Sequence, residues 1–146
     1  MCMKKFPLYS LVLFGFLCSH CSEAEDPEMA CPVVAVSGPD DDIVGKWKLV
    51  KGQAVFYEPR TEDYSCSDIV YHFQEDGQLV ISSTIEGFQG FSAGQHNYEF
   101  LQAPLLDHDY TLKIESVKIP CSVSGSSMIL DDSALDGPIL HLARIQ

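Results

Sequence analysis

The chain has 146 residues and carries 21 acidic against 9 basic side chains, which gives a formal charge of −12. This length allows one domain with a tail and excludes large two-domain enzymes. The acidity argues against a nucleic-acid partner, because phosphates repel such a surface. Hydrophobic residues make up 46% of the chain, enough for a folded core.

The first twenty residues have the features of an export signal. Lys4 and Lys5 supply positive charge, and an apolar run follows at residues 8–17. This run is too short for a permanent membrane helix, which needs about 20 residues. We therefore predict that residues 1–20 are a signal peptide that is removed and takes no part in the fold.

Cysteines stand where a cleavage site of small residues would normally follow. Cys21 is followed directly by Ser-Glu-Ala-Glu-Asp. This pattern resembles bacterial lipoproteins, and in particular the surface-exported outer-membrane lipoproteins of Bacteroides-type bacteria. The resemblance implies lipidation at Cys21 and an outer-membrane location; Cys18 is the rival position, and a plain signal peptide is the alternative. Several acyl chains would anchor the protein stably.

The segment 21–42 is acidic and contains three prolines, and it ends in three aspartates at 40–42. Such a composition is typical of a solvated chain, so we predict a flexible tether. Cleavage before Cys21 would remove two lysines and no acid, which changes the formal charge from −12 to −14. The folded domain is predicted at residues 43–146.

This domain has the alternating pattern of strands rather than helical periodicity. The turn Glu75-Asp76-Gly77 between two alternating runs predicts a hairpin. The predicted strands are 45–57, 69–74, a run around 79–81, 96–101, 110–115, 117–123, 127–130 and 138–145. Eight short strands at hairpin spacing predict an all-β fold, an antiparallel barrel or sandwich.

Two residues at the ends of this domain carry a family resemblance. The first predicted strand opens with Gly45-Lys46-Trp47, and the last one carries Arg144. The pair is similar to that of lipocalins and the wider calycin group. The resemblance implies an up-and-down barrel in which Arg144 packs on Trp47 and closes one end. Because the domain is shorter than a typical lipocalin, its interior is expected to be small, filled, or open on one side.

The glycine-rich segment 87–94 contains a Gly-x-Ser-x-Gly pattern at 90–94. We interpret it as a loop between strands, since a serine hydrolase needs a strand-to-helix turn at this motif. Phe88 and Phe91 on this loop either meet a ligand or fold over the barrel end. With Tyr71 and Trp47 they are the candidate ligand-binding residues, and no catalytic residue is assigned.

The remaining cysteines and histidines give no metal or cofactor site. Processing would leave Cys31, Cys66 and Cys121, which form at most one disulfide within the chain, of open pairing. The histidines at 72, 96, 108 and 141 lack the local spacing of a metal site. The acidic segment 131–137 lacks the ligand pattern of a calcium loop, so we predict a polar turn.

The sequence favours a non-enzymatic protein, attached to a membrane by its lipid, that binds a small hydrophobic or glycan ligand at one barrel end. The alternative is a protein-interaction or inhibitor module with a filled barrel. A cavity would favour the first function, and a packed interior with an exposed apolar patch the second. The sequence assigns no oligomeric state.

Overall fold

The computed structural model describes residues 29–56, 58–103 and 105–146. The predicted signal peptide, Cys18 and Cys21 lie outside the described residues. The strands are β1 (Gly45–Ala54), β2 (Arg60–Asp63), β3 (Ile69–Phe73), β4 (Gln78–Ser83), β5 (Gly94–Leu101), β6 (Tyr110–Ile114), β7 (Val117–Ser124), β8 (Ser127–Asp131) and β9 (Ile139–Ile145). A single 3-10 turn, η1 (Ser133–Leu135), precedes β9. In these ranges no helix is long and apolar enough to cross a membrane.

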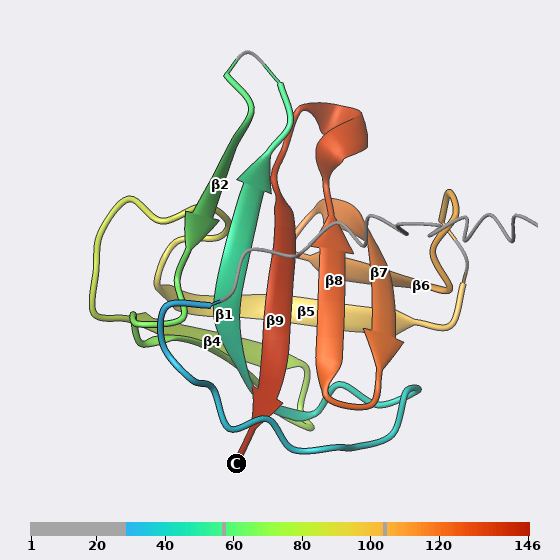
Figure 1. Cartoon of the computed structure of the whole chain (residues 1–146). Helices are drawn as coiled ribbons and strands as arrows, with labels where there is room; N and C mark the ends of the chain where they lie inside the picture. The colour runs from blue at the N-terminus through green and yellow to red at the C-terminus, as the bar shows by residue number, and fades with distance from the viewer. Residues whose placement is uncertain (1–28, 57, 104) are drawn as a thin grey trace, which may run out of the picture.

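The strands form one antiparallel sheet in which sequence neighbours pair, except that β2 and β3 each pair with β1, and β1 also pairs with β9. This last pairing closes an eight-stranded barrel made of β1 and β3–β9 (Figure 1). The first half of β1 pairs with β3, and its second half pairs with the additional strand β2. The prediction of an all-β, up-and-down antiparallel barrel is therefore confirmed.

The barrel interior is filled by its own side chains. Alternate residues of the strands point inward, as in β3, where Ile69, Tyr71 and Phe73 are buried and the residues between them are not. The buried core also includes Trp47, Leu49, Leu79, Ile81, Leu112, Ile114, Ile119, Cys121, Met128, Leu130, Leu140 and Leu142. This packing leaves no room for a large ligand along the barrel axis.

The first predicted strand, 45–57, is too long, and β2 was not predicted. β1 ends at Ala54, and the chain returns as β2 to pair with the second half of β1. The four residues of β2, Arg-Thr-Glu-Asp, are polar or charged and show no alternation of apolar residues. Their extended conformation comes from pairing with β1, which local sequence cannot reveal.

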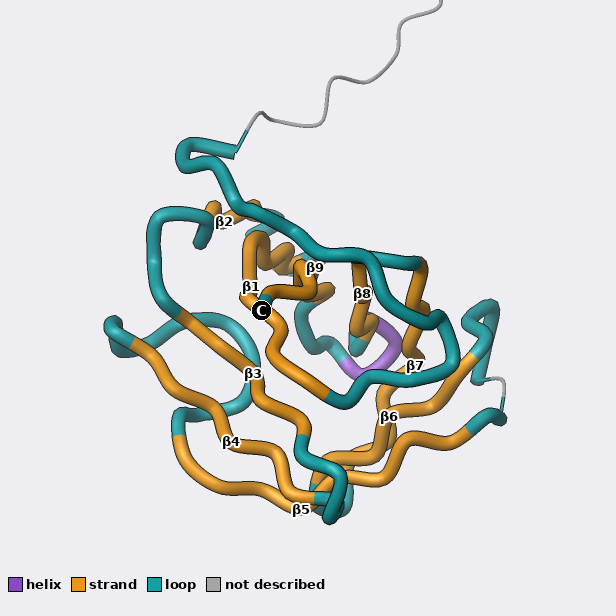
Figure 2. The backbone as a smooth tube through the Cα atoms, turned by 90° about the horizontal axis from the view of Figure 1, so that it is seen from below, coloured by secondary structure: helices purple, strands orange, loops and turns teal. Residues whose placement is uncertain are grey.

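The predicted tether also needs correction. Residues 29–42 do not stand free but run along the barrel, as Figure 1 shows in blue to teal. The Val36 N–H donates to the Arg144 carbonyl at 2.9 Å, and the Gly38 N–H donates to the Gly125 carbonyl at 3.2 Å. Figure 2, from below, shows the segment crossing the end of the barrel. We call residues 29–42 the strap.

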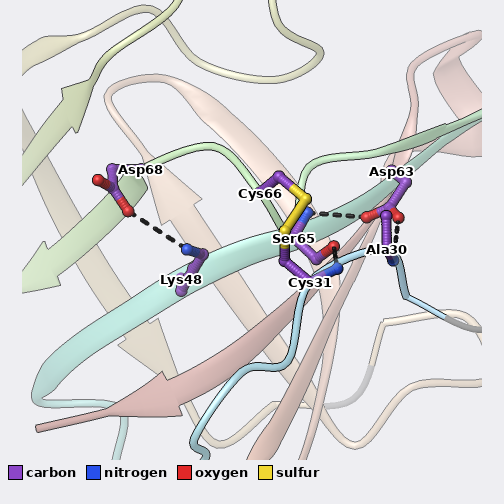
Figure 3. The surroundings of a disulfide bond; sticks show 7 residues. All are labelled: Ala30, Cys31, Lys48, Asp63, Ser65, Cys66 and Asp68. Carbon is purple, nitrogen blue, oxygen red and sulfur yellow. Dashed lines mark hydrogen bonds and ion pairs between the residues drawn. A yellow bond between two sulfur atoms is a disulfide. The ribbon is translucent and has the colours of Figure 1, made fainter.

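A disulfide between Cys31 and Cys66 fixes the start of the strap to the turn between β2 and β3 (Figure 3). Beside it, the Asp63 carboxylate accepts hydrogen bonds from the N–H groups of Ala30 and Ser65, at 2.7 and 2.8 Å. These bonds hold the pKa of Asp63 below its ordinary value. The pairing left open by the sequence is thus settled, and Cys121 stays a buried free thiol.

Replacing Cys31 and Cys66 together by serine should destabilise the protein by about 2–4 kcal/mol, because the disulfide restricts the unfolded chain. Urea unfolding of the oxidised protein and the double variant measures the difference. As a control, dithiothreitol should lower the midpoint of the unmodified protein and leave that of the double variant unchanged. Equal midpoints for the oxidised protein and the double variant would contradict a stabilising role.

Candidate functional site

One end of the barrel is closed by Arg144 and Trp47. The Arg144 guanidinium lies 4.3 Å from the centre of the Trp47 ring, a cation–π arrangement. Its Nη2 donates to the carbonyls of Pro39 and Asp42 at 2.8 and 2.6 Å, so the strap is held against this end. The Trp47 indole N–H donates to the Ile43 carbonyl. Trp47 has no exposed surface and packs against Arg144, so it belongs to this closure.

The loop between β4 and β5, residues 84–93, covers another opening of the barrel, which we call the mouth. Phe88 and Phe91 are partly buried and pack against the core. Gly90 has a φ of +111°, and a Cβ atom there would lie 2.7 Å from the Tyr71 hydroxyl and 2.8 Å from Leu140 Cδ1. Only glycine permits this close approach. The loop therefore acts as a fitted cover over Tyr71.

Two neighbouring cavities lie at the mouth and share Gly90 and Pro138. The first has a volume of about 230 Å³ and is lined mainly by apolar groups, among them Phe91, Ile119, Leu130 and Leu140, with one carboxyl, Asp132. The second, of about 200 Å³, is lined by Phe56, Arg60 and Gln89 among others. Both are smaller than the roughly 300–1,000 Å³ of drug-sized ligand sites.

Polar atoms without partners lie buried beneath the cover. The Tyr71 hydroxyl and both polar side-chain atoms of Gln89 are buried and make no hydrogen bond to any described residue. Burial raises the pKa of Tyr71 well above its ordinary value. The nearby backbone of Phe91 lowers this pKa in part, but its contact with the Tyr71 hydroxyl does not have the geometry of a hydrogen bond. Such groups normally meet a water molecule or a ligand.

The neighbouring Tyr64 hydroxyl is, by contrast, fully paired. It accepts the Gln89 N–H at 2.9 Å and donates to the Glu62 carboxylate. Burial and the bond to Glu62 raise the pKa of Tyr64 to about 12. On the other side of the mouth, burial and the nearby Asp131 charge raise the pKa of Asp132. The mouth therefore combines apolar walls with a few polar groups that a small ligand can satisfy.

The histidines and the Gly-x-Ser-x-Gly segment were the other groups of the sequence with possible chemistry. The His96 ring Nε2 lies 2.9 Å from the backbone carbonyl of Ser92 in the Gly-x-Ser-x-Gly segment, so this ring nitrogen contacts the backbone of Ser92 and not its hydroxyl. No group of three or more His, Cys, Asp or Glu side chains in residues 29–56, 58–103 and 105–146 is arranged to hold a metal ion.

An apolar groove of about 500 Å³ lies outside the barrel, between the strap and the outer wall. Met29, Val33 and Ala35 of the strap line one side, and strand residues such as Val50 and Ile129 line the other. These outward apolar side chains explain why the strap lies on the wall instead of extending into solvent.

The structure brings Tyr71, Phe88 and Phe91 together at the mouth, and places Trp47 in the closure of the barrel instead. Sequence reasoning missed Gln89 and Asp132. The glycines of the 87–94 segment were the signal in the sequence for the cover. Asp132 lines the first mouth cavity because the turn before β9 places it there. That turn is polar, with the Asp131 carboxylate accepting the Ser133 N–H at 3.0 Å.

Fold and site together define a closed, lipocalin-like up-and-down β-barrel with a filled interior and a small covered mouth. Comparison of the chain with family models, with curated proteins and with solved structures finds no match.

Replacing Tyr71 by phenylalanine should raise the free energy of unfolding by about 1 kcal/mol, because it removes a buried hydroxyl without a partner. The matched change Tyr64→Phe should lower it by about 1–3 kcal/mol, since it leaves the Gln89 N–H without its partner and removes one of the bonds of the Glu62 carboxylate, which keeps its ion pair with Arg60. Chemical denaturation of both variants tests this pair. A loss of stability in Tyr71→Phe as large as that in Tyr64→Phe would contradict the unpaired state of the Tyr71 hydroxyl.

Proposed function

We propose that the protein is an exported, non-catalytic binding protein, a lipocalin-like lipoprotein attached to the outer membrane through Cys21. Its ligand is a small molecule with an apolar body and one or two hydrogen-bonding groups, and it binds at the mouth. The leader and the Gly-x-Trp and arginine pair support the assignment to this class, and the covered mouth supports the ligand.

The observation that carries the proposal is the set of unpartnered polar atoms under the cover, the Tyr71 hydroxyl and the Gln89 amide. Gln89 lines the second cavity, whereas Tyr71 is fully buried and lines neither cavity, so the cover must move aside for a ligand to reach its hydroxyl. A buried polar group without a partner costs about 1–3 kcal/mol, which a ligand that pairs with it recovers. The apolar walls of the 230 Å³ cavity favour a ring or short alkyl group over a long acyl chain. Within the expected ligand classes, a small hydrophobic molecule thus fits better than an extended glycan.

Nuclear magnetic resonance tests the binding site. The ¹⁵N-labelled protein is titrated with a set of phenols and cyclic amides, which combine a ring with one hydrogen-bonding group. We expect the amide signals of residues 88–91 and 132–140 to shift. Tyr71→Phe should weaken the binding by about tenfold, because one hydrogen bond is lost.

The matched control is Tyr98→Phe, since the Tyr98 hydroxyl donates to the Gln74 carbonyl at the β3–β4 turn, whereas the Tyr71 hydroxyl lies directly beneath Gly90 of the cover. This variant should bind as the unmodified protein does. Shifts that map elsewhere, or equal affinities for both variants, would refute binding at the mouth.

The anchor is tested by labelling with radioactive palmitate in a bacterium that processes lipoproteins. Labelling should persist in Cys18→Ser and disappear in Cys21→Ser, because only the first mature cysteine receives the lipid. Labelling that survives in Cys21→Ser and is lost in Cys18→Ser would move the anchor to Cys18. Absence of label from the unmodified protein would exclude the lipoprotein proposal.

A second function, a protein-interaction or inhibitor module, is favoured by one different observation, the filled interior. In such a module the outer surfaces make the contacts. The two functions are distinguished by the titration above, which probes the mouth alone.

A further inference from the structure

A notch of about 190 Å³ lies outside the barrel, at the turn between β5 and β6 and the turn before β9. Its walls are Leu105, Pro120 and Ala134, and it is flanked by Leu106 and Leu135. The two flanking leucines are 67% and 73% exposed; among the large apolar residues that the structure describes, only Val34 of the strap is more exposed, at 84%. Two loops distant in sequence thus present leucines to solvent around one apolar depression.

The Asp131 carboxylate holds both leucine-bearing turns in place. Its Oδ1 accepts the Ser133 N–H at 3.0 Å, which fixes the turn that carries Leu135. Its Oδ2 lies 3.3 Å from the His108 Nε2, and the His108 Nδ1 lies 2.9 Å from the Ser122 hydroxyl. Burial raises the pKa of Asp131, but these hydrogen bonds from Ser133 and His108 outweigh it and lower the pKa. The notch is therefore a built surface with fixed walls.

Asp131, His108 and Ser122 have the residue types of a hydrolytic triad, but here their hydrogen bonds hold the walls of the notch in place. In a triad the serine hydroxyl faces Nε2 of the histidine and the carboxylate faces Nδ1; here the two nitrogens are exchanged. Ser122 also lies within strand β7, in register with Ile129 of β8, rather than on an exposed turn. The histidine links the β5–β6 turn to two strands.

Leu106 adopts a conformation that is costly for leucine. Its φ is +56°, in the left-handed region, within a turn closed by two hydrogen bonds between Leu105 and His108. Glycine, asparagine or aspartate are normally found at such positions. A leucine that is both strained and exposed gains nothing for the fold, which points to a contact outside the chain.

The rim of the notch is acidic. Asp131 and Asp132 line it, and Asp107 and Asp136 are the chain neighbours of the two exposed leucines. Lys118 is the one basic side chain in the lining. A partner with positive charge around an apolar side chain would be attracted and oriented by this rim.

From this combination we propose that the notch docks a partner protein through one apolar side chain flanked by lysine or arginine residues. The apolar side chain inserts between Leu106 and Leu135, and the basic residues face Asp107, Asp132 and Asp136. This surface is separate from the mouth cavity proposed for the small ligand, although Asp132 borders both and Asp136, next to Leu135 in the chain, lines the second mouth cavity.

Selection from a random peptide library displayed on phage tests the proposal, with the purified protein as bait. Enriched peptides should share one apolar residue between lysines or arginines. Their binding should fall at least about tenfold with Leu106→Gly or Leu135→Ala, because most of the apolar contact is lost. Leu106→Gly should unfold at the same or a higher urea concentration, since glycine relieves the left-handed backbone. This separates loss of contact from loss of fold.

The matched control is Val34→Ala, which shortens an exposed apolar side chain on the strap and should leave peptide binding unchanged. Asp107→Asn should weaken binding, and the effect should diminish at high salt. Absence of enriched peptides, enrichment without the apolar-basic pattern, or insensitivity to Leu106→Gly would each overturn the proposal. A dimer in sedimentation that Leu106→Gly dissociates would assign the notch to a second copy of this chain and likewise overturn it.

Discussion

The contact of Arg144 with Trp47 joins three segments that are distant in the sequence at one end of the barrel. Arg144 is only 7% exposed, so the charge of its guanidinium must be compensated, and here an indole face and two strap carbonyls contribute to this. Gly38 of the strap packs so closely on it that a Cβ atom would lie 2.6 Å from the guanidinium carbon. One side chain thereby joins the last strand, the first strand and the strap, and closes the barrel end.

Arg144 closes that end of the barrel, and side chains fill its interior. The binding sites that we propose therefore lie at the surface loops. The 84–93 cover and the turn before β9 form the mouth, and the same turn forms one wall of the notch. Asp132 borders both, and the Asp131 hydrogen bonds fix the turn that carries it. The barrel thus serves as a rigid support for the two loop-built surfaces that we propose as binding sites, which is the usual division between scaffold and functional loops.

The sequence predicts the barrel well because its strands alternate inward and outward residues, as Ile69, Tyr71 and Phe73 show. The glycines of residues 87–94 also predict correctly that Phe88 and Phe91 lie on a loop between strands, and the structure packs both rings against the core. It misses β2, whose polar residues are extended only because β1 pairs with them. It misses the strap, because the acidic composition of 21–42 hides the packing of Val33, Val36 and Gly38 against the barrel. Contacts between segments distant in sequence decide these features, as they decide the pairing of Cys31 with Cys66.

The central claim is that the covered mouth holds a small ligand whose polar group pairs with Tyr71. Native mass spectrometry tests it most directly, on the full-length protein expressed in a bacterium that processes lipoproteins and released in mild detergent. We expect a reproducible mass above that of the lipid-modified chain, lost on denaturation and much reduced in Tyr71→Phe. The same bare mass before and after denaturation, in the unmodified protein and the variant alike, would contradict the claim.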